Sequence, residues 1–203
     1  MLVIAIAGGS GSGKSSVANL VQTFLIEQDY HCEILCEDQY YRSLSQQQLD
    51  NITEVDFDHP DAINHTLLTE QLDVIRSGEA IEVPIYCYKT HQRLSDTNTL
   101  SPPDVLILEG LHLLHRTALV SLYDLTVFVD TPIDTCLNRR IRRDIEERQR
   151  TRESVIAQFN KTVAPNYHEF ILPTKAKADV VLNGTHTFDQ LLTEIRPIVM
   201  EQL

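Results

Sequence analysis

The amino-acid sequence predicts an α/β fold in which a parallel sheet carries helices on both faces. Short apolar runs alternate along the chain with segments in which apolar residues recur at helical spacing. Several of these runs are nearly continuous, as expected for strands that are buried on both faces. A phosphate-binding motif lies between the first apolar run and the first helical segment. These features predict a single domain over residues 1–203.

The predicted elements alternate between strand and helix, apart from one long insertion. We expect strands at residues 2–7, 33–36, 105–108, 125–129 and 179–182. We expect helices at residues 13–28, 63–77, 133–148, 152–162 and 188–202. Residues 39–101 break the alternation, because they are polar and rich in turn residues, with one helix and a short hairpin around residues 81–94. Insertions of this kind at one end of a sheet commonly form substrate pockets.

Composition and charge narrow the class of protein. The net charge of −12 argues against general binding to nucleic acid or to an anionic membrane. No stretch approaches the roughly 20 apolar residues of a membrane span. The first apolar run leads directly into the phosphate-binding motif without a basic segment, so we expect a first strand and not a signal peptide, and a cytoplasmic protein. The cysteines form no C-x-x-C pair and predict no disulfide framework: Cys32, Cys36, Cys87 and Cys136.

The most specific motif is G-G-S-G-S-G-K-S at residues 8–15, a complete G-x-x-x-x-G-K-S phosphate loop. Its glycines let backbone N–H groups converge on phosphate oxygens, and the helix N-terminus adds partial positive charge. Lys14 can reach the β- and γ-phosphates of a nucleotide, and the Ser15 hydroxyl can ligate Mg²⁺. The predicted nucleotide-binding residues are Gly8, Gly9, Ser10, Gly11, Ser12, Gly13, Lys14 and Ser15.

Carboxylates follow two of the predicted strands. Glu109 ends an apolar strand, where acids beside a phosphate loop often hold Mg²⁺, although Glu-Gly also begins turns. Glu37 and Asp38 end the second strand and should face the ligand crevice at the carboxyl edge of the sheet. Asp38 is a candidate general base for an acceptor hydroxyl and a candidate third oxygen donor to the metal. A helix or turn cap explains Asp38 equally well from spacing alone.

Six arginines lie within twelve residues, although the chain has only 17 Lys plus Arg. Guanidinium groups near a transferring phosphate would stabilise its charge. The alternative is a solvated face with ion pairs to Asp144, Glu146 and Glu147. His112 and His115 are three residues apart without a surrounding cluster of ligands, so we interpret them as loop residues and not as a transition-metal site. The arginines are Arg139, Arg140, Arg142, Arg143, Arg148 and Arg150.

Five further segments carry a family resemblance: E-D-Q-Y-Y-R at 37–42, F-D-H-P-D-A at 57–62, P-I-Y-C-Y-K-T-H-Q-R at 84–93, R-R-I-R-R-D-I-E-E-R-Q-R at 139–150 and L-P-T-K-A-K-A-D at 172–179. On these segments the chain resembles the uridine kinase (uridine–cytidine kinase) family over nearly its full length. The resemblance implies a P-loop kinase fold with a five-stranded parallel sheet and a β-hairpin over the substrate site. It implies Mg²⁺-dependent transfer of phosphate from ATP or GTP to the 5′-hydroxyl of uridine or cytidine, in pyrimidine salvage. It also implies a homotetramer, with UTP or CTP as candidate feedback ligands.

The resemblance assigns roles to individual residues. It implies Asp38 as the general base, with Lys14, Arg143 and Arg148 completing the catalytic set. Asp58 and Arg143 would hold the ribose, and Tyr86 and His91 the base. A lid over residues 139–158 would place Arg140, Arg150 and Gln158 on the nucleoside side. Asp179 would lie near the donor nucleotide.

The sequence departs from the family pattern at three positions. Cys87 stands where Asp is common, Gln149 where Gly is common in the lid turn, and Glu37 where Gln is usual. Cys87 gives the base pocket a thiol where relatives have a carboxylate, and Gln149 makes the lid turn less permissive. None of the three removes a proposed catalytic group.

Three other functions fit the sequence less well. A regulatory GTPase would need N-K-x-D and D-x-x-G motifs, but residues 160–163 read N-K-T-V and no D-x-x-G is present. Another small-molecule kinase, such as phosphoribulokinase, would differ only in the pocket, and residues 86–93 argue against it. A noncatalytic nucleotide-binding module would not need Asp38, Glu109 and the arginines.

Overall fold

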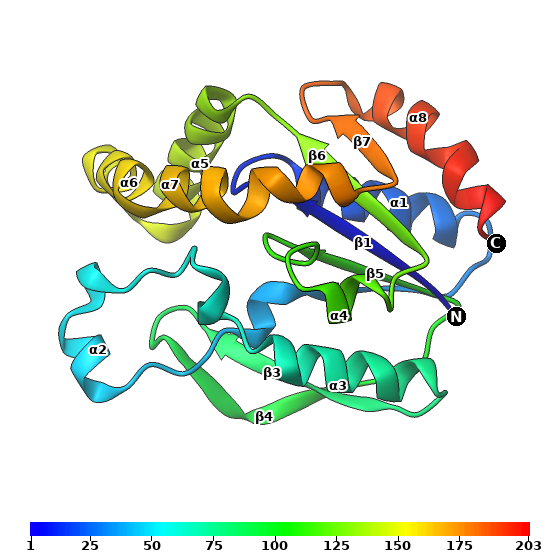
Figure 1. Cartoon of the computed structure of the whole chain (residues 1–203), viewed down its shortest axis with the longest axis horizontal. Helices are drawn as coiled ribbons and strands as arrows, with labels where there is room; N and C mark the ends of the chain where they lie inside the picture. The colour runs from blue at the N-terminus through cyan, green and yellow to red at the C-terminus, as the bar shows by residue number, and fades with distance from the viewer.

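Five strands form one parallel sheet in the order β2-β5-β1-β6-β7 (Figure 1). The computed structural model describes residues 1–203, apart from the side chain of Thr53. The predicted α/β fold and its parallel sheet are therefore confirmed. The carboxyl ends of the strands meet at one edge of the sheet, where the phosphate loop and the two predicted carboxylate positions also lie. The strands are β1 Leu2–Gly8, β2 Cys32–Cys36, β5 Val105–Gly110, β6 Leu125–Asp130 and β7 Val180–Asn183.

Side-chain alternation along β1 divides the core into two clusters. Leu2, Ile4 and Ile6 pack with α1 (Lys14–Ile26) and α8 (Phe188–Glu201) on one face. Val3, Ala5 and Ala7 lie in the cluster on the other face, with α3 (His65–Arg76), α4 (Thr117–Val120) and the hairpin. Figure 1 shows the same division, with α1 and α8 on one side of the sheet and α3, α4, β3 and β4 on the other. Period-two alternation within a strand thus gives helices on both faces.

The insertion contains one more helix and a longer hairpin than the sequence predicted. After β2 come α2 (Gln46–Asp50) and α3, and then β3 (Ile81–Cys87) pairs antiparallel with β4 (Gln92–Leu100). Arg93 fastens the hairpin to the segment after β2, because its Nε donates to Tyr41 O (2.8 Å) and its Nη2 to Tyr40 O (2.7 Å). The short helices α2 and α4 were not predicted, since four or five residues are too few for a clear helical period.

Residues 152–177, which follow α5 (Ile133–Arg148), form one long helical arm. Helix α5 ends at Gln149, whose φ of 54° is left-handed, the conformation that favours glycine. The predicted helix at 152–162 instead continues to residue 177 through α6 (Arg152–Gln158), α7 (Ala164–Asn166) and wider or tighter turns. Pro165 and Pro173 each fall in the first turn of a new piece, where a missing N–H costs little, so they do not end the arm.

Among the described residues, no helix combines the length and the apolar character needed to cross a membrane.

Candidate active site

The phosphate loop connects β1 to α1 at the carboxyl edge of the sheet. Gly11 and Gly13 have φ of 83° and 100°, and a Cβ on Gly11 would lie 2.4 Å from Cys136 O. Only glycine fits that position, because the loop passes against the backbone of α5. A cavity of about 380 Å³ opens beside the loop and extends to α5 and to the segment after β7. The loop is thus shaped to present its backbone to an anionic ligand.

Lys14 faces the carboxylate at the end of β5. Its Nζ lies 3.9 Å from Glu109 Oε2, and both side chains are largely buried. Cys36 Sγ donates to Glu109 Oε1 over 2.9 Å, whereas Oε2 is buried without a hydrogen-bond partner among the described side chains. A buried carboxylate oxygen with one distant cation has capacity for a further positive ligand. Glu109 therefore lies where a metal ligand is expected.

Asp38 lies in the 3₁₀ turn Glu37–Tyr40 that follows β2. Burial raises the pKa of Asp38 to about 6, although the nearby Lys14 ammonium acts in the opposite direction. Tyr88 donates its hydroxyl to Asp38 Oδ2 over 3.2 Å. Gln39, and not Asp38, accepts the hydrogen bond from the Cys36 N–H at the start of the turn. The carboxylate of Asp38 therefore does not cap the turn, which removes one of the two interpretations that the sequence left open.

The expectation that Glu37 also faces the crevice is wrong. Its carboxylate points into the protein, where it is within 2.9 Å of His65 Nε2 and accepts the His112 backbone N–H, also at 2.9 Å. Burial opposes the ionisation of Glu37, but these two histidines outweigh it and hold its pKa below the ordinary value. Glu37 therefore fixes the turn that carries Asp38.

His112 lies in the loop after β5, as the sequence predicted, but it is buried, which the sequence did not indicate. Its Nε2 lies 2.9 Å from the backbone carbonyl of Asp58, and burial lowers its pKa to about 4. It thereby connects the loop after β5 to the segment that carries Asp58. The sequence contains no local signal for this contact, which joins residues 54 positions apart.

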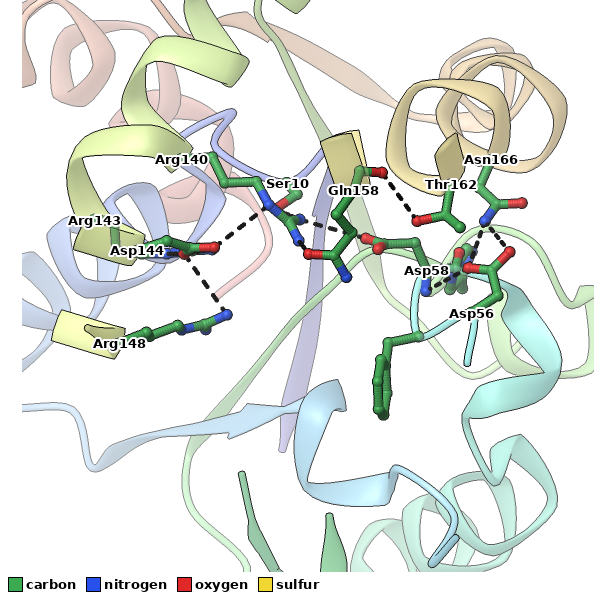
Figure 2. Close-up of polar contacts among 12 residues, drawn as sticks. Ser10, Asp56, Asp58, Arg140, Arg143, Asp144, Arg148, Gln158, Thr162 and Asn166 are labelled. Carbon is green, nitrogen blue, oxygen red and sulfur yellow. Dashed lines mark hydrogen bonds and ion pairs between the residues drawn. The ribbon is translucent and has the colours of Figure 1, made fainter. Parts of the chain in front are cut away.

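Four of the six arginines converge on one buried carboxylate, and Figure 2 shows three of them, Arg140, Arg143 and Arg148, around Asp144. Asp144 Oδ1 accepts from Arg143 Nη2 (2.8 Å) and Nε (3.0 Å), and Oδ2 accepts from Arg150 Nη1 (3.2 Å). Arg140 and Arg148 lie 3.7 and 3.8 Å from the same carboxylate. Burial opposes ionisation, but the Arg143 hydrogen bonds and the other guanidinium charges hold the pKa of Asp144 below its ordinary value. The cluster is neither of the two predicted alternatives alone, because its ion pairs are buried at Asp144 and leave excess positive charge.

Gln158 and Ser10 link this cluster to the arm and to the phosphate loop. Gln158 Oε1 accepts from Arg140 Nη2 (3.0 Å) and from Arg150 Nη1 (2.6 Å). Arg140 Nη1 donates to Ser10 Oγ over 2.8 Å. The structure thus brings the predicted residues Arg140, Arg150 and Gln158 together beside the phosphate loop.

Asp58 lies on the side of Arg140 that faces away from Asp144 (Figure 2). The residue is 5% exposed, and its Oδ1 is 3.6 Å from Arg140 Nη1. Burial raises the pKa of Asp58, and the Arg140 guanidinium offsets part of that rise. The Asp58 backbone N–H donates to Asp56 Oδ1, and Asp56 in turn accepts from Asn166 on the arm (Figure 2). Asp58 is held from both ends, by the arm through Asp56 and by His112 through its carbonyl.

The aromatic side chains of the hairpin form a corner and not a flat wall. The rings of Tyr86 and Tyr88 are 5.4 Å apart at 84°. His91, in the turn with φ of 53°, stacks on Phe57 at 4.9 Å. Tyr86 Oη and His91 Nδ1 are buried without hydrogen-bond partners among the described side chains. Two unpaired polar atoms on an aromatic surface suit a flat, polar ligand.

Arg148 completes the cleft, but Asp179 lies elsewhere. The Arg148 guanidinium lies 5.6 Å from the Tyr88 ring centroid, across the gap between α5 and the hairpin. Asp179 precedes β7 at the amino edge of the sheet, where its Oδ2 accepts from the Thr126 N–H and hydroxyl. The residues that follow β7, Gly184 and His186, line the cavity beside the phosphate loop instead. The structure therefore does not bring Asp179 to the predicted donor site, because the parallel sheet places the two ends of β7 at opposite edges.

Comparison with known proteins agrees with this geometry. The model of the phosphoribulokinase / uridine kinase family matches residues 3–190. The chain belongs to that family. A protein from Vibrio campbellii called uridine kinase is 44% identical over 183 residues, covering 89% of this chain and 86% of that protein. A uridine kinase from Escherichia coli is 43% identical with the same coverage.

Solved structures show the same fold. A structure described as a possible uridine kinase from Bacillus stearothermophilus has a TM-score of 0.65 at 23% identity, covering 90% of this chain and 88% of that one. This likeness shows the fold, and the family match shows that the chain is a phosphotransferase of a kinase family.

Proposed function

We propose that this protein is a uridine kinase, which transfers the γ-phosphate of ATP or GTP to the 5′-hydroxyl of uridine and cytidine. The observation that carries the proposal is the position of Asp38, a half-buried carboxylate at the carboxyl edge of the sheet, near Lys14 of the phosphate loop, with a pKa raised to about 6. The relatives called uridine kinase, at 43–44% identity, support uridine as the acceptor. By the same family likeness we propose a cytoplasmic homotetramer in pyrimidine salvage, with UTP and CTP as feedback ligands.

In the proposed reaction the nucleoside hydroxyl donates its proton to Asp38. Its oxygen then bonds to the γ-phosphorus as the bond to the β-phosphate bridging oxygen breaks, and ADP leaves. A base with a pKa close to working pH is well matched to this task. Lys14 and the loop N–H groups would stabilise charge on the donor phosphates, and Arg143 and Arg148 charge on the transferred group.

A divalent cation fits the residues present. Glu109 Oε2 is buried and lacks a hydrogen bond among the described side chains, and Ser15 begins α1 next to Lys14. Among the described residues no group of three His, Cys, Asp or Glu side chains forms a metal site, so the cation would take its other ligands from Asp38, water or the nucleotide. Mg²⁺ bound there would neutralise phosphate charge.

The acceptor would lie between the hairpin and the arm. Asp58 and Arg143 would hold the ribose hydroxyls, while Arg140, Arg150 and Gln158 would order the surface that faces it. Tyr86 and His91 would contact the pyrimidine. In this proposal His91 forms the hydrogen bonds that recognise the base. Burial lowers its pKa and keeps the imidazole neutral, with one donor and one acceptor nitrogen.

One assay tests the proposal. Purified protein with ATP and Mg²⁺ is given uridine, cytidine, deoxyuridine, adenosine or ribulose 5-phosphate, and each product is identified by mass spectrometry. We expect UMP and CMP, poor turnover of deoxyuridine because Asp58 is buried and would lose a partner, and no product from the last two. Phosphorylation of ribulose 5-phosphate without UMP would overturn the proposal and assign another acceptor of the same family.

A further inference from the structure

Tyr88 contacts both sides of the cleft from the turn of the hairpin. It lies between Cys87, the last residue of β3, and Gln92, the first of β4. Its hydroxyl donates to Asp38 Oδ2 over 3.2 Å, and among the described side chains no other hydrogen bond to that carboxylate is made. Its ring is 5.6 Å from the Arg148 guanidinium. The proposed mechanism uses neither contact.

The hydroxyl of Tyr88 makes the contact that the acceptor must make. A base receives a proton along a hydrogen bond, so the acceptor hydroxyl has to donate to Asp38 before transfer. A phenol and a ribose alcohol are both O–H donors and cannot share one position. The 3.2 Å contact is longer than the 2.5–2.7 Å usual for O–H···O⁻ bonds, so it is weak enough to be exchanged.

Tyr88 is also free to move out of the way. The residue is 51% exposed and lies outside the paired strands, so turning its side chain breaks no ladder hydrogen bond. Its neighbour Tyr86, by contrast, is buried and pairs with Arg93 in the ladder.

We propose that, while no nucleoside is bound, the Tyr88 hydroxyl occupies the acceptor position on Asp38 and keeps water out of it, and that the nucleoside displaces it. The inference rests on the proposed function. Water hydrogen-bonded to Asp38 would be a nucleophile: its oxygen would bond to the γ-phosphorus, the bond to ADP would break, and Asp38 would take the proton, giving ADP and phosphate. Tyr88 is a positioning residue that makes use of ATP depend on the nucleoside.

Tyr88→Phe tests this by removing the hydroxyl and keeping the ring. Two quantities are measured with ATP and Mg²⁺: ADP release without uridine, and KM and kcat with uridine. We expect ADP release without uridine to rise by about 3- to 10-fold and the KM for uridine to fall by a similar factor, because one exchangeable hydrogen bond no longer competes. Tyr123→Phe, which removes a buried hydroxyl outside the site, should change neither.

The outcomes separate this inference from the proposed function. Absence of UMP from the unaltered protein contradicts the function, while the comparison of ADP release still tests Tyr88. Unchanged ADP release and KM in Tyr88→Phe overturn the inference alone. So does a raised KM without extra ADP, which makes the hydroxyl a substrate contact, and so does phosphotyrosine at Tyr88 after incubation with ATP, which makes it an acceptor.

Discussion

The phosphate loop is built from backbone within eight consecutive residues, whereas the acceptor side of the cleft is built from side chains far apart in the chain. The loop needs Gly11 and Gly13 in left-handed conformations, and distant segments support it through Thr131 and Arg139, which both donate to Ser12 O. The acceptor side needs Asp38 after β2, Asp58 in the insertion, Tyr88 in the hairpin and Arg143 on α5. The first geometry is local and the second depends on tertiary packing.

The difference also lies in how charge is held. At the loop, one lysine faces one carboxylate, Lys14 to Glu109 at 3.9 Å. On the acceptor side a single buried carboxylate, Asp144, holds four arginines, two of which are linked again by Gln158. A change at Asp144 should therefore disturb several contacts together, and a change at Lys14 one ion pair.

The largest effect is expected at the base. Asp38→Asn keeps the shape of the side chain and removes the proton acceptor, which should lower kcat by about 10²- to 10⁴-fold. ATP affinity should change little, because the donor site is formed by the loop. Steady-state kinetics with uridine and a direct ATP-binding measurement check this, with Asp73→Asn on the exposed face of α3 as the matched control. Weaker ATP binding with unchanged kcat would instead make Asp38 a metal ligand.

At the loop, Lys14→Ala should lower kcat/KM by about 10²- to 10³-fold, since one cation aimed at the transferring phosphate is lost. The loss should be the same for uridine and cytidine as acceptors. Both substrates and the melting temperature are measured. An effect that differs between acceptors would contradict the separation of the two halves, and full activity would exclude a phosphate-binding role.

The same division explains what the sequence could predict. The phosphate loop, the buried strands and the position of Glu109 at the end of a strand follow from short motifs and periodicity. The structure has all three at the predicted positions. The inward turn of Glu37, the burial of His112 and the convergence on Asp144 could not be read from spacing, because each depends on a partner that only the fold brings near. Asp179 shows the same limit: a segment resemblance does not say which end of a strand reaches the site.

Lowering the pH should reduce proton transfer to Asp38 before it affects the phosphate loop. Asp38 accepts a proton only when ionised, and its raised pKa of about 6 means that it becomes protonated at a higher pH than an ordinary carboxyl. We expect kcat/KM for uridine to be flat above about pH 7 and to fall about tenfold per unit below 6. The residual activity of Asp38→Asn should lack this fall. A profile that stays flat to pH 5 would show that the group is not the base.

Asp144→Asn tests whether one carboxylate organises the arginines. The amide keeps the volume but leaves guanidinium groups without their shared anion, so we expect about 2 kcal/mol of lost stability and a roughly tenfold lower kcat. Glu147→Gln makes the same change of charge on the exposed side of α5 and should do neither. Unfolding in denaturant and turnover are measured together. A loss of stability with unchanged kcat would limit Asp144 to a structural role.

The smallest effect is expected at the edge of the acceptor site, in the hairpin turn. His91 stacks on Phe57, and its Nδ1 is buried without a hydrogen-bond partner among the described side chains, which leaves one nitrogen for a ligand. His91→Ala should raise the KM for uridine and for cytidine by about 3- to 10-fold, the range of one hydrogen bond, with the KM for ATP unchanged. His31→Ala, at an exposed position on the opposite edge of the sheet, is the control and should leave all three values unchanged. If His91 only packs against Phe57, the substitution will lower the melting temperature while both nucleoside KM values stay the same, and the pyrimidine must then be recognised by another part of the hairpin.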